Sequence, residues 1–238
     1  MTHTVHPYAH RLGIIRDWKS RWFATTKKTY RENIVVDETI RAYLSKKLRS
    51  SYVAAIEIER SAAEIRVILH TARPGLVIGR SGENAGKLRK ELTDVVRKVA
   101  PLHNRSVKLD IVEIRQPETN AAVVGYMIAA GLEKRLPFRR VLKGTVDKVM
   151  AVREVIGVRI VISGRLGGAD MSRTEQIKKG RIPLQTFRAN IDYAHVEAKL
   201  PYGQIGIKVW IYLGDTFNEK EMPAQPARPA AARSASPR

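Results

Sequence analysis

Two glycines separated by two residues, Gly79 and Gly82, form the part of this chain that most clearly predicts binding chemistry. A Gly-x-x-Gly turn leaves two stretches of backbone without side-chain bulk, so ribose and phosphate can approach the chain closely. N–H groups at the start of a following helix can then donate to phosphate oxygens. An ordinary turn between two helices could have the same sequence. The surrounding elements must decide between a phosphate-binding loop and a plain turn.

The predicted elements around this loop run helix, strand, strand, helix, helix, strand over residues 38–114. Asp37 is the predicted N-cap of the first helix. Pro74 opens a short helical turn before the glycines, and a long amphipathic helix follows them. This is the order of a type II KH fold, whose Gly-x-x-Gly loop clamps about four nucleotides. The KH interpretation is therefore favoured over a plain turn, with expected RNA contacts from Arg73, Gly79, Arg80, Ser81, Gly82 and Lys87.

Residues 115–215 predict two helices followed by four strands. Asn120 is the predicted N-cap of the first helix, and Pro137 separates it from the second, which runs to about Arg153. This order predicts an α+β domain of two helices packed on a mostly antiparallel four-stranded sheet. Residues 1–37 form a basic and aromatic extension. Residues 216–238 form a Pro/Ala/Arg tail that is predicted to be disordered. The predicted strands span 158–163, 171–179, 190–200 and 205–212.

The composition points to a polyanionic partner. The chain has 43 Lys and Arg against 23 Asp and Glu, a formal net charge of +20 and a pI near 10.4. Such a field attracts nucleic acid or acidic membranes. The longest apolar candidate, Ala121–Leu132, is shorter than the ~20 residues that span a bilayer. No secretory signal is visible, and the absence of cysteine fits a reducing compartment. Nucleic acid in the cytoplasm is the expected partner.

A second basic cluster lies at the start of the helix that follows Pro137. Arg139, Arg140 and Lys143 share one sector of this helix, and an apolar stripe that includes Leu142 occupies the other side. Such a cluster is either a solvated cationic face or a binding surface. Asp147 lies one turn further along in the same sector, where it is expected to offset part of the positive field.

The segment 164–168, Gly-Arg-Leu-Gly-Gly, superficially resembles a nucleotide-binding loop. It lacks the Gly-Lys-Ser/Thr ending of a P-loop, and no helical pattern follows it. A tight turn between strands explains it better and would leave Arg165 free to contact RNA phosphate. The full set of predicted cationic contacts to structural RNA is Arg11, Arg165, Arg173, Lys178, Lys179, Arg181 and Arg188.

The N-terminal histidines and aromatic residues allow more than one interpretation. His3, His6 and His10 lack nearby carboxylate or thiolate partners, so we expect no metal site. Trp18 and Phe23, with Trp22 between them, could stack on bases or pack against a partner protein, and an anchoring role is favoured. No catalytic constellation stands out, so neither an enzymatic activity nor a cofactor is expected.

Short motifs through residues 1–215 resemble one family in unbroken order. They are Val5-His6-Pro7, 11–14, Trp18-x-Ser20-x-Trp22-Phe23, 70–79, Phe138-Arg139-Arg140, 163–169, 180–184 and 202–210. The ordered set resembles the bacterial small-subunit ribosomal protein three family, the KH-containing ribosomal proteins of the small-subunit head.

This resemblance implies a structural constituent of the small subunit that contacts small-subunit rRNA and incoming mRNA. It implies ribosomal proteins ten and fourteen as neighbours and places Arg139, Arg140 and Lys143 at the mRNA entry, where they assist passive unwinding of structured message. One alternative is a free KH-domain regulator of mRNA, which would leave the ordered C-terminal motifs unexplained. An ATP-driven RNA remodeller is a second alternative, but it would need a phosphate-binding motif that this sequence lacks.

Overall fold

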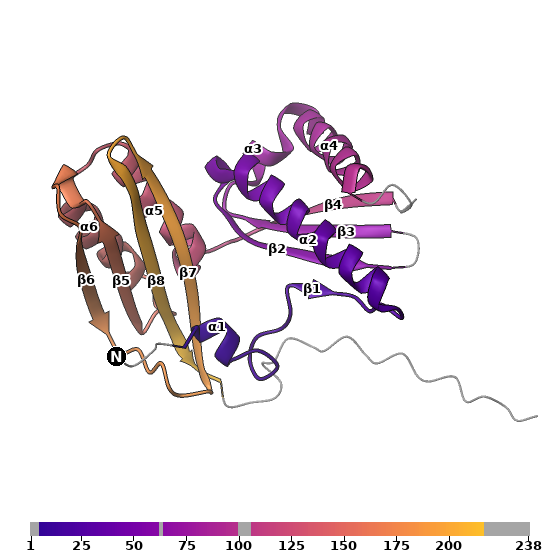
Figure 1. The fold of residues 1–238 in the computed structure, drawn as a ribbon. Coiled ribbons are helices and arrows are strands. Elements are labelled where there is room, and N and C mark those ends of the chain that lie inside the picture. Colours follow the sequence, from indigo (N-terminus) through magenta and orange to yellow (C-terminus); the bar gives the residue numbers. More distant parts are fainter. Residues whose placement is uncertain (1–4, 62–63, 100–105, 217–238) are drawn as a thin grey trace, which may run out of the picture.

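The chain folds into two α+β halves, each built on a four-stranded sheet (Figure 1). The computed structural model describes residues 5–61, 64–99 and 106–216. His3 and all of the predicted tail beyond Thr216 lie outside the described residues. Among the helices within those ranges, none is both long enough and apolar enough to cross a membrane. The predicted α+β class, with a KH-like half followed by a second sheet domain, is confirmed.

The first half contains a mixed sheet with the strand order β1-β2-β3-β4. Strand β2 pairs antiparallel with β3, whereas β1 runs parallel to β2 and β4 parallel to β3. Helices α2 and α4 cover one face of this sheet (Figure 1). The element bounds are β1 Ser20–Arg21, α2 Lys27–Lys47, η1 Arg49–Ser51, β2 Val53–Arg60, β3 Glu64–Thr71, α3 Pro74–Ile78, η2 Arg80–Gly82, α4 Glu83–Val99 and β4 Ser106–Glu113.

Alternation along the strands and a helical stripe build the core of this half. Ile65, Val67 and Leu69 of β3 are fully buried, because every second side chain faces the helices. Leu92 of α4 and Leu44 of α2 are also fully buried and belong to the same cluster. This packing fixes the base of the loop that carries Gly79 and Gly82.

Helix α2 begins eleven residues earlier than the sequence predicted. Its N-cap is Thr26, whose hydroxyl accepts from the Thr29 N–H at 3.3 Å. Asp37, the predicted cap, lies inside the helix and is buried. It accepts hydrogen bonds from the Trp22 indole at 2.8 Å and from Arg60 Nε at 3.0 Å. The predicted cap is therefore wrong: Asp37 ties the extension and β2 to the helix.

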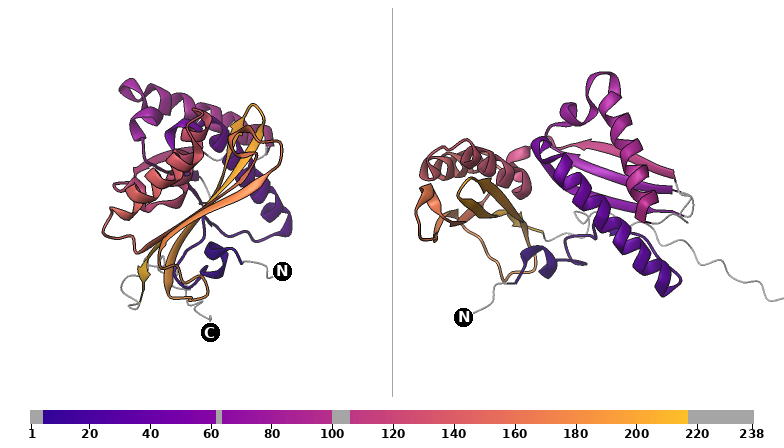
Figure 2. Two further views of the ribbon diagram at one scale, coloured as in Figure 1. Left: turned by 90° about the vertical axis from the view of Figure 1, so that its left-hand side faces the viewer. Right: turned by 45° about the horizontal axis from the view of Figure 1, so that its top comes forward.

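The second half is an antiparallel sheet with the strand order β6-β5-β8-β7. Helices α5 and α6 lie on one face of it, as Figure 2 also shows from two further directions. The predicted N-cap of α5 is confirmed, since Asn120 accepts from the N–H groups of Ala122 and Val123. The bounds are η3 Pro117–Thr119, α5 Ala121–Glu133, α6 Phe138–Met150, β5 Gly157–Gly164, η4 Leu166–Gly168, β6 Arg173–Gly180, β7 Ala189–Leu200 and β8 Gly203–Asp215.

A few side chains join the two halves. Arg49, which follows α2, donates to the Glu197 carbonyl at 2.8 Å and to the Glu133 carboxylate at 2.5 Å. Tyr52 stacks on Tyr126, with 6.3 Å between the ring centroids. The short helix α1, Pro7–His10, lies against β7 of the second half, so the N-terminal extension spans both halves (Figure 1).

Candidate nucleic-acid interface

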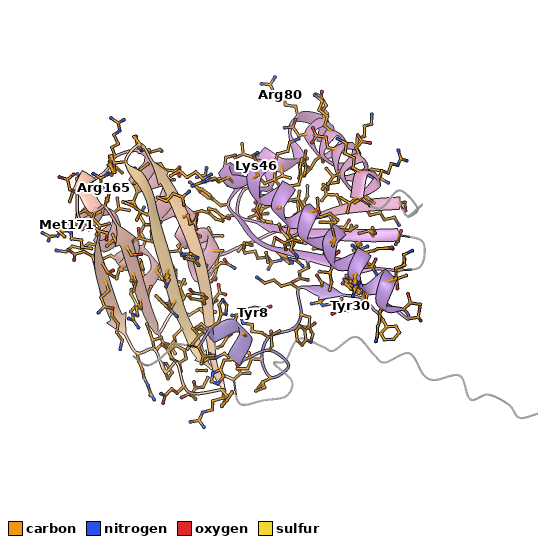
Figure 3. All side chains as sticks on the ribbon, in the orientation of Figure 1. Tyr8, Tyr30, Lys46, Arg80, Arg165 and Met171 are labelled. Carbon is orange, nitrogen blue, oxygen red and sulfur yellow. The ribbon has the colours of Figure 1, made fainter. Side chains whose placement is uncertain are left out.

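The Gly-x-x-Gly loop lies at the tip of the first half, where α3 ends and α4 begins. Arg80 projects from this tip into solvent (Figure 3). Gly79 and Gly82 have φ values of +73° and +78°, a region that glycine adopts without steric cost. A Cβ on Gly79 would lie 2.6 to 2.9 Å from the Asn84 side chain. Gly79 is therefore needed for the shape of the loop, and the backbone around Gly82 is open to a ligand.

The charged candidates around this loop are not equally available. Lys87 pairs with Glu83 at 2.5 Å, one turn apart on α4. Glu83 lies in the first turn of α4, where its negative charge opposes a phosphate at the helix N-terminus. The Arg73 guanidinium lies 4.3 Å from the centre of the Tyr52 ring. Arg80 is thus the cation of this loop best placed to meet a phosphate.

Helix α6 presents its three predicted cations to solvent. Arg139, Arg140 and Lys143 are all exposed, and the Arg139 side chain retains 72% of its accessible surface. Leu142 and Val146 are buried on the opposite side and pack into the core of the second half. Because these apolar residues hold the helix, the cations are not needed to hold it and can form a binding surface.

Strand β6 brings two further candidates beside α6. The guanidinium groups of Arg139 and Arg173 both lie over the Phe138 ring, at 5.6 and 5.4 Å from its centre. Both guanidinium groups also approach Glu175, at 3.7 and 3.8 Å. One carboxylate thus faces two arginines, and a net positive charge remains at this corner.

Asp147 does not act on the α6 cations as the sequence suggested. Its carboxylate pairs with Lys179 of β6 at 3.0 Å. Lys179 therefore neutralises Asp147, and the field of Arg140 and Lys143 is offset less than predicted. The same contact means that Lys179 meets RNA only in competition with Asp147.

Arg165 is not free, contrary to the sequence-based expectation. Its guanidinium donates to the Ala169 carbonyl at 2.8 Å and pairs with Asp170 at 3.0 Å. These contacts close the turn that contains η4. Arg165 lies at the tip between β5 and β6 together with exposed Met171 (Figure 3). Its guanidinium therefore stabilises its own loop.

Arg11 cannot be an RNA contact, and this prediction is wrong. The residue has no exposed surface, and its guanidinium donates to backbone carbonyls of its own segment and of the loop before β7. Burial lowers the pKa of Arg11 from its ordinary value, and nearby Arg16 lowers it further. Arg11 thus fastens the N-terminal extension to the second half. The acceptors are Pro7 at 3.0 Å, Pro183 at 3.4 Å, Leu184 and Thr186 at 2.9 Å, and Ala189 at 2.6 Å.

The remaining candidates lie away from α6. Lys178 is exposed on the face of the second sheet opposite the helices. Its neighbour Lys179 faces α6, and successive side chains of a strand point to opposite faces of the sheet. Arg181 is exposed just after β6, and Arg188 pairs with Asp215 at 3.3 Å. His10 packs on Phe187, with ring centroids 4.2 Å apart.

Comparison with known proteins supplies the family. The KH domain model matches residues 39–119, and the model "Ribosomal protein S3, C-terminal domain" matches residues 128–211. A protein of Caldicellulosiruptor saccharolyticus named small ribosomal subunit protein uS3 is 46% identical over 94% of this chain and 98% of its own length. The protein of the same name from Clostridium perfringens is 43% identical over 93% of this chain and 96% of its own.

The chain belongs to the uS3 family. The resemblance predicted from the motifs is thereby confirmed. Membership makes the chain a structural protein of the small ribosomal subunit, for which RNA binding and a part in translation follow from the family. The uS3 relatives have the name of a ribosomal protein and not of an enzyme.

Sequence reasoning missed two cations of the second sheet. Arg159 of β5 and Lys208 of β8 lie on the same sheet face as Lys178, in adjacent strands. The period-two pattern of 157–163 and 205–212 places both residues opposite the buried positions. That alternation is visible in the sequence, but the pairing of β5 with β8 is not.

A charge reversal at the loop tip tests the phosphate-binding prediction. Arg80→Asp with Ser81→Asp leaves both glycines in place and should weaken binding of single-stranded RNA by the full chain roughly tenfold, which corresponds to about 1.4 kcal/mol. Fluorescence anisotropy with a labelled oligonucleotide measures this. The control is Arg97→Asp with Lys98→Gln, which changes the net charge equally at the far end of α4. Equal loss in both variants would mean that the loop is not an RNA clamp.

Proposed function

We propose that this protein is a structural constituent of the small-subunit head in the cytoplasmic ribosome. In this proposal it binds small-subunit rRNA and incoming mRNA at the entry site, and it assists passive unwinding of structured mRNA. The observation that carries the proposal is the α6 surface. Three exposed cations, Arg139, Arg140 and Lys143, stand on a helix that the buried core holds in place.

The mechanism is electrostatic and needs no covalent chemistry. Lysine and arginine neutralise RNA phosphates and release counterions, which supplies affinity without reading sequence. Arg140 and Lys143 have no carboxylate partner among the residues that the structure describes. They can therefore hold the phosphates of opened strands. Translocation by the ribosome would supply the work of unwinding, and the α6 surface would hinder re-annealing.

The KH loop is a second RNA contact in this proposal. Its backbone at Gly82 is open, and Arg80 is exposed beside it. Figure 3 shows Arg80 far from the corner of the second half that carries Arg165 and Met171. The loop and α6 would therefore contact separate stretches of RNA.

The exposed aromatic residues of the extension support a contact between this protein and neighbouring proteins. Trp18, Phe23 and Tyr30 are 61, 87 and 52% exposed, which is unusual for large apolar side chains. We assign this surface to contacts with ribosomal proteins ten and fourteen.

The domain limits 1–37, 38–114, 115–215 and 216–238 are part of the same proposal. Helix α2, Lys27–Lys47, crosses the first of these limits.

Crosslinking in assembled small subunits tests the proposal. An mRNA that carries a photoreactive nucleotide downstream of the decoding site should crosslink to residues 138–150 of this protein. A message that is too short to reach the entry site should lose that crosslink. Mass spectrometry of the crosslinked peptides gives the site. Absence of α6 peptides, with the protein present in the particle, would remove mRNA contact from the proposal.

A further inference from the structure

The second sheet has a face opposite its helices, on which the predicted RNA contact Lys178 lies beside cations that the sequence did not single out. Helices α5 and α6 cover one face, whereas α1 lies against β7 on the other, where Ile182 and Leu184 also pack against Trp210 and Tyr212 (Figures 1 and 2). We call this the outer sheet face and define it by its outward residues, which are Lys178 and Gln176 of β6, Arg159 of β5, Lys208 and Trp210 of β8, and Tyr193 and His195 of β7. Strand register places Lys178, Arg159, Trp210 and Tyr193 in one row across all four strands.

The centre of the outer sheet face is rigid and cationic. The Arg159 guanidinium lies over the Trp210 ring, 5.1 Å from its centre, and donates to Gln176 at 2.9 Å. Tyr193 packs on the other side of the row, with its ring centroid 5.1 Å from that of Trp210. Arg159 is thereby held flat against the sheet, and its position is fixed before any ligand arrives.

Two lysines flank this centre without partners. Lys178 and Lys208 are exposed, and neither has an acidic or hydrogen-bonding partner within the described ranges. They lie on strands separated by β5, which are about 10 Å apart at the usual strand spacing, and they are offset by two residues along the strands. His195 lies beside Lys208 in register and is also exposed. Glu197 is the acidic residue of β7 that points outward on this face.

The sheet of the first half differs from the outer sheet face in how its charges are paired. Its exposed cations are paired within the sheet. Arg66 pairs with Asp110 and lies 3.7 Å from Glu59, and Lys108 pairs with Glu64 at 2.5 Å. Both sheets have four strands, but among the described residues Lys178 and Lys208 of the outer sheet face have no acidic partner, whereas Lys108 of the first sheet has one.

We propose that the outer sheet face binds the phosphate backbone of RNA through Arg159, Lys178 and Lys208. This inference rests on the proposed function, since it adds an RNA contact to a ribosomal protein. The aromatic rings of this face are half-buried or buried, so they offer no platform for base stacking. Contact is therefore to phosphates and independent of sequence. The lack of large exposed apolar side chains argues against a protein partner.

The face has a cationic continuation at its β7 edge. A cavity of about 390 Å³ lies between the two halves, and its lining includes Tyr193 and His195 from the outer sheet face. Lys19 and Arg41 line the side that belongs to the first half and the extension. An RNA backbone that crosses the face can thus continue toward the first half over positive side chains.

The test compares two double variants of equal charge in the full chain. Lys178→Gln with Lys208→Gln removes two cations from the outer sheet face. Arg66→Gln with Lys108→Gln removes two from the paired face of the first sheet. Both pairs are exposed, so native circular dichroism is expected for each. Binding is measured by anisotropy over a salt series. The probes are a single-stranded oligonucleotide of about twelve nucleotides and a helical fragment of small-subunit rRNA.

The outer-face variant should bind about fivefold more weakly, and its log–log salt slope on the single strand should fall by roughly 1.4 in magnitude, which is about 0.7 for each lost contact. The control should lose less than about twofold, since exposed ion pairs contribute little. A larger loss on the helical fragment assigns the face to rRNA, and a larger loss on the single strand assigns it to mRNA.

Equal losses in the two variants would overturn the proposal, because net charge alone would then explain the effect. Unchanged RNA binding with reduced incorporation into small subunits would also overturn it and indicate a protein interface. Failure of the wild-type chain to enter small subunits, while the two variants still differ in RNA binding, would overturn the proposed function and leave the RNA-binding face standing.

Discussion

Arg11→Ala should lower the free energy of unfolding of the second half by roughly 3 kcal/mol or more. The guanidinium has no exposed surface and donates to backbone carbonyls of residues as distant as Ala189. Hydrogen bonds to a charged donor contribute about 1.5 to 3 kcal/mol each, and several buried acceptors would lose their partner together. Urea unfolding followed by circular dichroism measures the loss. Limited proteolysis should show earlier cleavage of the extension, since α1 would no longer be held against β7.

Two further variants make this prediction specific. Arg11→Lys keeps the charge but has three donors on a compact ammonium in place of the planar fork, so it should restore only part of the stability. Arg80→Ala removes the same side chain from an exposed loop and should change stability by less than about 0.5 kcal/mol. If Arg11→Ala were as mild as Arg80→Ala, the buried network would not be what fastens the extension.

The features predicted correctly from the sequence are those specified by neighbouring residues. The Gly79–Gly82 loop follows from two glycines between helical segments, and Asn120 with Pro137 marks two ends of helices that the structure confirms. The alternation of apolar residues around Ile65 and around Ile160 correctly predicted the buried face of each sheet. Each of these depends on backbone conformation or periodicity within a few residues.

The features that were missed depend on contacts between distant residues. Arg11 has the sequence appearance of a surface cation, and only the fold brings it to the carbonyls of residues 183–189. The early start of α2 was missed because its first turns, at Lys27–Arg31, have no apolar stripe. Tertiary contacts hold that end of the helix. Tyr30 packs on Trp22, and the Trp22 indole donates a hydrogen bond to Asp37. Arg165 was misjudged because its partner Asp170 lies across a turn of unpredicted shape.

Replacing Arg139, Arg140 and Lys143 together with alanine should slow translation through a stable hairpin roughly threefold or more. Three phosphate contacts would be lost, and the salt dependence of binding to single strands should fall by about 2.1, or 0.7 for each contact. The fold should remain intact, because Leu142, Val146 and Val149 hold α6 from the other side. Assembly of the subunit should likewise be unchanged.

The rate on structured message is the measurement that tests this account most directly. Ribosomes that carry the triple variant are compared with wild type on two messages, which differ only in a hairpin placed just ahead of the entry site. The control variant changes Lys90, Arg97 and Lys98 of α4 to alanine, with the same loss of charge. The account predicts slower translation only for the α6 variant and only on the hairpin message. Equal rates for the α6 variant and wild type on that message would contradict it and make these cations a solvated surface.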